Sequence, residues 1–271
     1  HCVNNGSTAV EVAIKMAIQY WWNGGGSRES GVGSQESGEG SRRNKVLALK
    51  NAYHGDTFGA MSVSDRGIFT LAFQDKLFEV IFIDTTDLEE AAKKLSSRSL
   101  PDSRLQTPDS RLAFHPDEIA CFIYEPLIQG AVGMKIYEAE QLNELLKTLK
   151  AYEIICIADE VMTGFGRTGN LFASLYVEEK PDIICLSKGL TGGTMAMGVT
   201  ACSKKIHDAF VSDDKLKTFF HGHSYTANPL ACTAALASLD LLLDQSRLQN
   251  IERINQQHQE FVAQLQTTNH K

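Results

Sequence analysis

The feature that most constrains the fold is a series of short, almost unbroken apolar runs separated by segments of helical periodicity. A strand exposed on one face alternates apolar and polar residues, so these runs indicate strands covered on both faces. The predicted strands are Lys45–Leu49, Val80–Ile83, Ile119–Tyr124, Ile154–Ala158, Ile183–Leu186 and Gly198–Cys202. The pattern predicts an α/β fold with a mostly parallel sheet and helices on both faces, in which right-handed crossovers bring most loops after strands to one edge.

The segments between and after these runs supply the predicted helices. Apolar residues recur at helical spacing after Asn5-Gly6-Ser7-Thr8, a cluster typical of a helix start, as far as Trp21. Further helices are predicted at Leu88–Leu95, Glu138–Tyr152, roughly Arg167–Val177, Asn228 to about Asp244, and about Leu248–Gln266. We expect residues 1–244 to form one large domain of a longer protein, and residues 245–271 to form a helix that leads out of it.

Two inserts interrupt this plan. Residues 23–44 are dominated by glycine, serine and charge without apolar periodicity, which is typical of a mobile loop. Residues 96–115 contain the tandem copies Pro101–Leu105 and Pro108–Leu112, which indicate a local duplication in a mobile surface loop. No chemistry is assigned to either insert.

Composition excludes several classes of function. A formal net charge of −7 argues against a nucleic-acid or anionic-membrane surface. No apolar stretch is long enough to span a bilayer. The six cysteines lack metal-ligand spacing, and Cys121, Cys156 and Cys185 lie in apolar runs, so we expect reduced, buried thiols and a cytoplasmic location. His221 and His223 have no suitable third ligand nearby, so no metal site is predicted.

Two ionisable residues end apolar runs. Asp159 follows Ile154–Ala158, and Lys188 follows Ile183–Leu186 and precedes a glycine-rich turn. A charge beside a buried strand costs free energy unless it has a partner or a function, and ligands bind at the carboxyl ends of such strands. A lysine amine and a carboxylate that converge there fit pyridoxal phosphate, because the amine can form a Schiff base and the carboxylate keeps the pyridine nitrogen protonated. Either residue alone also fits an ordinary surface turn.

Three further segments carry candidate groups with plain alternatives. Gly6 and Ser7 could bind a phosphate at a helix N-terminus, although the same cluster fits an ordinary helix cap. Tyr53 could stack on a flat ring or belong to a polar loop. Arg167 lies in a glycine-rich turn that matches no phosphate-loop motif. Glu160 is expected to bind locally or to support the neighbouring loop.

Together these residues resemble the class III, fold-type-I aminotransferases, which use pyridoxal phosphate. The resemblance is carried by the stretches Asn5–Trp21, Tyr53–Ser62, Ile157–Gly169 and Leu186–Thr194. Met162 stands where ornithine- and aminobutyrate-type members have glutamine, which favours the branch in biotin biosynthesis. That branch transfers an amino group, usually from S-adenosylmethionine, to 8-amino-7-oxononanoate.

The resemblance implies a smaller domain after the helix at residues 245–271, and a role for each matching residue. Gly6 and Ser7 would hold the cofactor phosphate, and Tyr53 would lie against the cofactor ring near the substrate. Asp159 would pair with the pyridine nitrogen. Lys188 would carry the cofactor and move the proton during transfer.

Other roles are implied at the edge of the site or across a homodimer with shared active sites. Gly222 would line the substrate pocket, and His223 and Ser224 would reach the phosphate of the partner subunit. Many members have proline and threonine at these last two positions. Arg167 and Asp56 would join a polar network near the substrate. Two alternatives remain open: another class III enzyme for ornithine, aminobutyrate or another ω-amine, and a non-catalytic cofactor-binding module.

Overall fold

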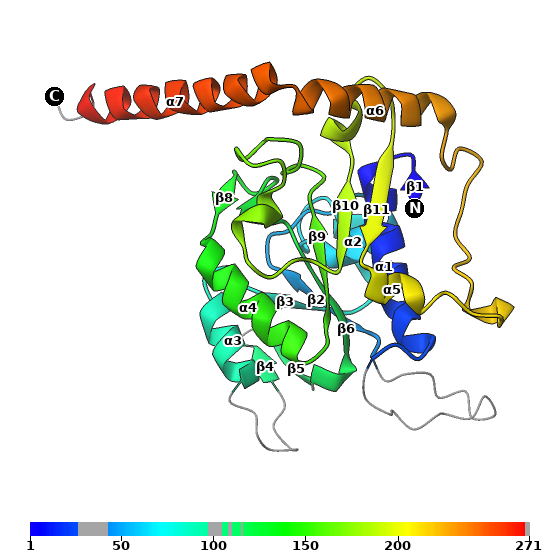
Figure 1. The fold of residues 1–271 in the computed structure, drawn as a ribbon. Helices are drawn as coiled ribbons and strands as arrows, with labels where there is room; N and C mark the ends of the chain where they lie inside the picture. The colour runs from blue at the N-terminus through cyan, green and yellow to red at the C-terminus, as the bar shows by residue number, and fades with distance from the viewer. Residues whose placement is uncertain (27–42, 97–104, 108–109, 115, 269–271) are drawn as a thin grey trace.

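A seven-stranded sheet forms the centre of the molecule, with strand order β1-β11-β10-β9-β6-β2-β3 (Figure 1). This computed structural model describes residues 1–26, 43–96, 105–107, 110–114 and 116–268. The strands are β1 (Cys2–Val3), β2 (Lys45–Leu49), β3 (Val80–Ile83), β6 (Ile119–Tyr124), β9 (Ile155–Asp159), β10 (Ile183–Leu186) and β11 (Gly198–Cys202). Strands β3, β2, β6, β9 and β10 run parallel, whereas β11 is antiparallel to both of its neighbours. The mostly parallel sheet is therefore confirmed.

Both faces of the sheet are covered, which explains why its strands are apolar at nearly every position. Side chains alternate between the faces of a strand. In β2, Val46 and Ala48 belong to a core with α1 (Gly6–Trp22), whereas Leu47 and Leu49 belong to a second core. That second core contains the buried faces of α3 (Leu88–Ser96) and α4 (Ala139–Ala151). Each fully buried valine, leucine, isoleucine or phenylalanine side chain in these cores contributes about 2 kcal/mol to the free energy of folding.

The predicted strands agree with the structure, apart from β9, which begins and ends one residue later than expected. The helix predicted at about Arg167–Val177 is wrong, because the chain forms only a 3-10 turn at Ala173–Tyr176. The amides of Ala173 and Ser174 donate to the buried carboxylate of Glu160 over 3.1 and 2.6 Å. Glu160 therefore accepts hydrogen bonds from two amides of this turn and supports the neighbouring loop, as expected.

Several short elements were not predicted. They are β1, α2 (Phe58–Val63), α5 (Lys204–Asp208), the 3-10 turns Leu71–Lys76, Pro116–Glu118, Lys188–Thr191 and Lys215–Lys217, and the strand pair β7 (Ile128–Gln129) and β8 (Lys135–Ile136). Within the second insert, β4 (Leu105–Thr107) and β5 (Ser110–Phe114) form an antiparallel pair in place of the expected loop. The rest of that prediction, and most of the first insert, lies outside the described residues.

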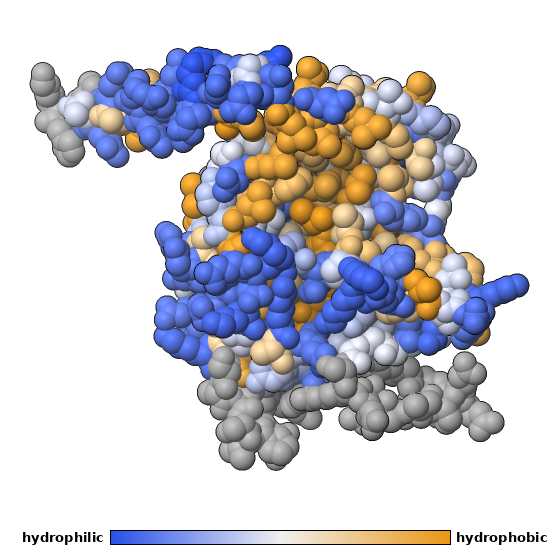
Figure 2. All heavy atoms as spheres, viewed as in Figure 1, coloured by the Kyte–Doolittle hydropathy of each residue, from blue (hydrophilic) through white to orange (hydrophobic). Residues whose placement is uncertain are grey.

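The last two helices lie across one end of the sheet (Figure 1). Helix α6 (Pro229–Leu243) packs Ala231 and Ala235 against Met197 beside β11. Helix α7 (Gln245–Thr268), longer than predicted, extends away from the body of the molecule. Figure 2 shows apolar residues gathered below α6, and within α6 the side chains of Leu230 and Leu236 are 71% and 65% exposed. Among the described residues, no helix combines the length and apolar character needed to cross a membrane.

Candidate functional site

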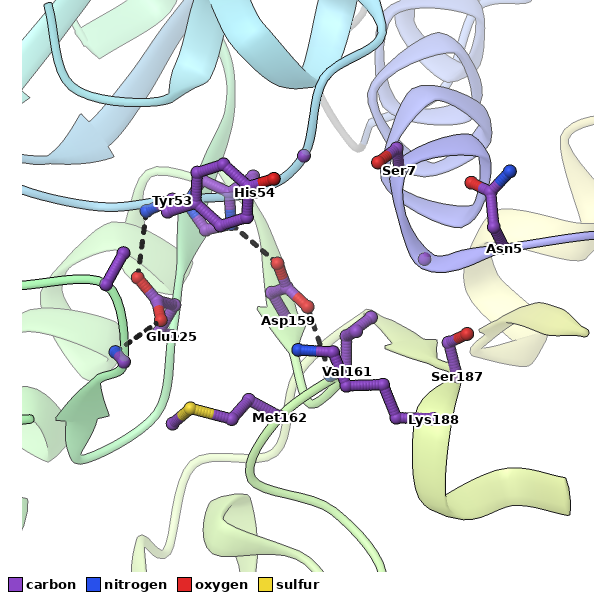
Figure 3. A pocket seen from close by; sticks show the side chains of 14 residues that line it. Asn5, Ser7, Tyr53, His54, Glu125, Asp159, Val161, Met162, Ser187 and Lys188 are labelled. Carbon is purple, nitrogen blue, oxygen red and sulfur yellow. Dashed lines mark hydrogen bonds and ion pairs between the residues drawn. The ribbon is translucent and has the colours of Figure 1, made fainter. Parts of the chain in front are cut away.

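A cavity of about 490 Å³ lies at the carboxyl ends of β2, β6, β9 and β10, and at the start of α1 (Figure 3). It is lined by Asn5, Gly6, Ser7, Tyr53, His54, Gly55, Glu125, Gly130, Ala131, Asp159, Val161, Met162, Ser187 and Lys188. Parallel strands end at one edge of a sheet, and their loops meet there. The structure therefore brings together Gly6, Ser7, Tyr53, Asp159 and Lys188, which the sequence had placed in one site.

Asp159 lies at the floor of the cavity as the last residue of β9. One carboxylate oxygen contacts Nδ1 of His54 at 2.7 Å, and the other accepts a hydrogen bond from the amide of Val161 at 3.1 Å. The side chains of His54 and Asp159 are 0% and 5% exposed, so water screens this contact little. Nε2 of His54 is buried and has no hydrogen-bond partner among the described residues. Asp159 is thus held by two groups while it lines the cavity.

Lys188 begins the turn that follows β10. Its backbone φ of 45° lies in the left-handed region, which costs a residue with a side chain of order 1–3 kcal/mol and is common at functional sites. The preceding Ser187 is anchored, because its hydroxyl donates to the carbonyl of Met197 at 2.6 Å. The Lys188 side chain is exposed and lines the cavity. The turn therefore places this side chain at the cavity and not in a packed core.

The start of α1 forms another wall of the cavity. Asn5 is the helix cap, since its side-chain oxygen accepts from the amide of Thr8 at 2.9 Å. The amides of the first turn have no partners within the helix, and this creates an anion-binding position. A Cβ on Gly6 would lie 2.8 Å from a methyl group of Val161, so glycine permits close packing. Both interpretations of this cluster, a cap and a phosphate site, are compatible with the structure.

Tyr53 and Asp56 form a hydrogen-bonded pair in the loop after β2. The Tyr53 hydroxyl donates to the Asp56 carboxylate at 2.9 Å, and the ring is 37% exposed. Partial burial raises the pKa of the Tyr53 hydroxyl, and the bond to Asp56 adds to this effect. The backbone amide of Asp56 donates to the Ser7 hydroxyl at 3.2 Å. The loop of Tyr53 is therefore attached directly to the first turn of α1.

Glu125 follows β6 and is buried beside the cavity. One carboxylate oxygen accepts from the amide of Tyr53 and the other from the amide of Gly130, each at 3.0 Å. Burial raises the pKa of the Glu125 carboxyl above its usual range, and nearby His54 and the two amides oppose that shift. The carboxylate connects two of the loops that bound the cavity.

Five residues implied by the resemblance do not line this cavity. One is Asp56, which pairs with Tyr53 in the loop after β2. Arg167 is exposed and does not line it. Gly222, His223 and Ser224 belong to the segment between α5 and α6 and do not line it either. Their roles stay predictions, and for His223 and Ser224 the expected site is that of a partner subunit.

The sequence interpretation missed His54 and Glu125 as site residues. His54 is adjacent to Tyr53, which had been selected for its ring alone. Glu125 directly follows the apolar run Ile119–Tyr124, so it satisfies the same rule that selected Asp159. Applying that rule to every apolar run would have found this carboxylate.

Comparison with known proteins gives one consistent result. The model of the family described as aminotransferase class III matches residues 1–271. An adenosylmethionine-8-amino-7-oxononanoate aminotransferase of Synechococcus elongatus is 43% identical, over 96% of this chain and 57% of its own length. The protein of the same name from Staphylococcus aureus is 40% identical, over 92% and 53%. The chain spans little more than half the length of these curated relatives.

Solved structures show the same likeness. The adenosylmethionine-8-amino-7-oxononanoate aminotransferase of Methanocaldococcus jannaschii superposes with a TM-score of 0.75 at 34% identity, covering 92% of this chain and 52% of that chain. An amine transaminase from an uncultivated Pseudomonas species, solved with bound pyridoxal phosphate, gives a TM-score of 0.72 at 30% identity, with coverage of 89% and 52%. The fold around the cavity is thus one found in transaminases.

Proposed function

This chain belongs to the class III aminotransferase family, and we propose that it is the cofactor-binding part of a pyridoxal-phosphate-dependent aminotransferase. The observation that carries the proposal is the cavity itself. It gathers an amine from Lys188, a carboxylate from Asp159 and an anion-binding helix start at Gly6 and Ser7. These groups come from three separate elements and match the three polar parts of the cofactor: its aldehyde, ring nitrogen and phosphate.

The residues present fit the cofactor. The carboxylate of Asp159 keeps unused acceptor capacity, because each of its oxygens has one described partner. No hydrogen bond or ion pair of the Lys188 amine is found among the described residues, so this group is available to a ligand. Bound pyridoxal phosphate supplies an electron sink for the carbon that loses a proton.

Each side chain then has a defined task in this proposal. Asp159 would accept a hydrogen bond from the protonated ring nitrogen, and His54, 2.7 Å from the carboxylate, keeps that carboxylate oriented. The amine of Lys188 would hold the cofactor aldehyde and, when free, would accept and donate the proton at the reacting carbon. Ser7 binds the phosphate while its oxygen accepts the amide of Asp56. Tyr53 restricts where the substrate lies above the ring.

We further propose that the reaction transfers an amino group, with S-adenosylmethionine as donor, to 8-amino-7-oxononanoate to give 7,8-diaminononanoate. Support comes from the curated relatives that carry this activity in their names, at 43% and 40% identity. The apolar side chain of Met162 in the cavity wall is compatible with the same branch. A homodimer, in which His223 and Ser224 reach the partner's site, and a cytoplasmic location complete the proposal.

The experiment is a transamination assay of the full-length protein with pyridoxal phosphate and 8-amino-7-oxononanoate. S-adenosylmethionine, lysine, ornithine and 4-aminobutyrate are compared as donors, and simple ketones as alternative acceptors. We expect 7,8-diaminononanoate to form fastest with S-adenosylmethionine, and no turnover in Lys188→Ala. Preference for a simple amine and ketone would favour an amine transaminase, a function named for the similar Pseudomonas structure. Turnover retained by Lys188→Ala would refute the mechanism.

A further inference from the structure

Glu125 is the only carboxylate among the described cavity-lining residues besides Asp159, and the proposed reaction gives it no task. It comes directly after β6, in the middle of the sheet, and is 5% exposed. Its two oxygens bind two different segments: the amide of Tyr53 after β2 and the amide of Gly130 at the end of β7, each at 3.0 Å. Figure 3 shows the carboxylate between these segments, beside the cavity.

The surroundings leave this carboxylate little freedom. The Tyr137 hydroxyl donates to the backbone carbonyl of Glu125, which fixes the start of the loop. A Cβ on Gly130 would lie 2.2 Å from the sulfur of Met162, so Met162 packs closely against Gly130. Burial raises the pKa of the Glu125 carboxyl, His54 lowers it, and Asp159 raises it further. Both residues belong to the floor of the same cavity.

We propose that Glu125 is a positioning residue, whose carboxylate fixes the Tyr53 ring and the Gly130 segment relative to each other by holding both backbone amides. The inference rests on the proposed transamination and adds to it the group that sets the width of the substrate site. Tyr53 contributes its ring to the cavity, but the position of its backbone depends on Glu125. Two amides held by one rigid carboxylate cannot separate without breaking a charge-assisted hydrogen bond.

Glutamine tests this role because it has nearly the same size but only one acceptor oxygen. In Glu125→Gln one backbone N–H would face the NH2 group, so either Tyr53 or Gly130 has to move. A displacement of about 1 Å near reacting groups can cost about 100-fold in rate. We expect kcat/KM of the full-length enzyme to fall about 10- to 100-fold, while Lys188 still binds the cofactor.

A double-mutant cycle with Tyr53→Ala separates positioning from general disturbance. If Glu125 acts through the Tyr53 ring, Glu125→Gln lowers kcat/KM less than about 3-fold once that ring is absent. Glu160→Gln is the matched control. Its buried carboxylate also accepts two backbone amides, from Ala173 and Ser174, but does not line the cavity. We expect a change of less than about 3-fold there. If Glu125→Gln does not fold, Glu125→Asp, which is too short to reach both amides, replaces it in the cycle.

The outcomes are distinct. The proposal is supported if Glu125→Gln lowers kcat/KM more than Glu160→Gln does, and if this effect of Glu125→Gln disappears in the Tyr53→Ala variant. An active wild type with an unimpaired Glu125→Gln variant overturns it and leaves the aminotransferase assignment standing. If Glu125→Gln lowers kcat/KM equally in the wild type and in the Tyr53→Ala variant, the proposed action through Tyr53 is overturned. A full-length wild type without any transamination overturns the proposed function, and this inference with it.

Discussion

Substituting Gly55 tests whether the loop of Tyr53 and the first turn of α1, which is proposed to bind the cofactor phosphate, are one unit. Gly55 has a φ of +125°, and a Cβ there would lie 2.1 Å from the hydroxyl oxygen and 2.8 Å from the Cα of Ser7. The backbone conformation disfavours alanine by about 1–2 kcal/mol. Overpacking against the helix backbone adds about 1–3 kcal/mol. Gly55→Ala should therefore lower the free energy of unfolding by about 2–5 kcal/mol.

The same change should weaken cofactor binding, because the new methyl group displaces the side chain proposed to bind the phosphate. A hydrogen bond to a charged group contributes about 1.5–3 kcal/mol, which corresponds to roughly 10- to 100-fold in affinity. The assay is urea unfolding of the full-length protein without cofactor, followed by absorbance titration with pyridoxal phosphate.

Gly24→Ala provides the control for backbone strain alone. Gly24 has a φ of +90°, and no atom lies within 4 Å of the position that a Cβ would take, so alanine meets no neighbour among the described residues. It should lose about 1–2 kcal/mol of stability from strain and keep its cofactor affinity. If Gly55→Ala bound the cofactor as tightly as Gly24→Ala, the claimed contact between the two segments would be refuted.

Three further predictions follow from the site and the core. Asp159→Asn should bind cofactor but slow the first half-reaction at least about 100-fold, because the cofactor ring loses the negative charge opposite its nitrogen. The rate is measured by stopped-flow absorbance, and a near-normal rate would contradict this prediction. Burial raises the pKa of the Glu125 carboxyl in the folded state. As the pH rises from about 4 through that raised pKa, ionisation of Glu125 therefore lowers the free energy of unfolding. The stability of Glu125→Gln relative to wild type should therefore increase over that interval in urea titrations, and a fall would oppose the assignment. Burial also raises the pKa of Cys121, to about 12, and those of Cys156 and Cys185, so a thiol reagent at pH 8 should label these three only after denaturation.

The sheet was predictable because its strands are buried on both faces. Every position of Ile119–Tyr124 is buried, so the run is apolar throughout and its limits can be read from the sequence. Short elements gave no comparable signal. Helix α2 spans only Phe58–Val63, too short for a helical period to appear, and is tied to α1 by Glu11, which accepts the amide of Ala60 at 3.2 Å. Tertiary contacts of this kind, and not local periodicity, determine whether such a short segment is helical.

The site was predictable where chemistry coincides with a strand end. Asp159 and Lys188 met that rule, and Gly6 and Ser7 were marked by the helix start. His54 required the fold, because its contact with Asp159 joins residues 105 positions apart in the chain. The exposure of Lys188 could not be predicted from the sequence either, because it depends on the left-handed φ that turns the chain at the cavity.

The most direct test of the account is to identify the residue that carries the cofactor. The full-length protein is incubated with pyridoxal phosphate, reduced with borohydride, digested and mapped by mass spectrometry. The account predicts a visible absorbance band that reduction removes, and a cofactor label on Lys188 alone. A folded protein with no band, or with the label on another lysine, would contradict the assignment of this cavity as an aminotransferase site.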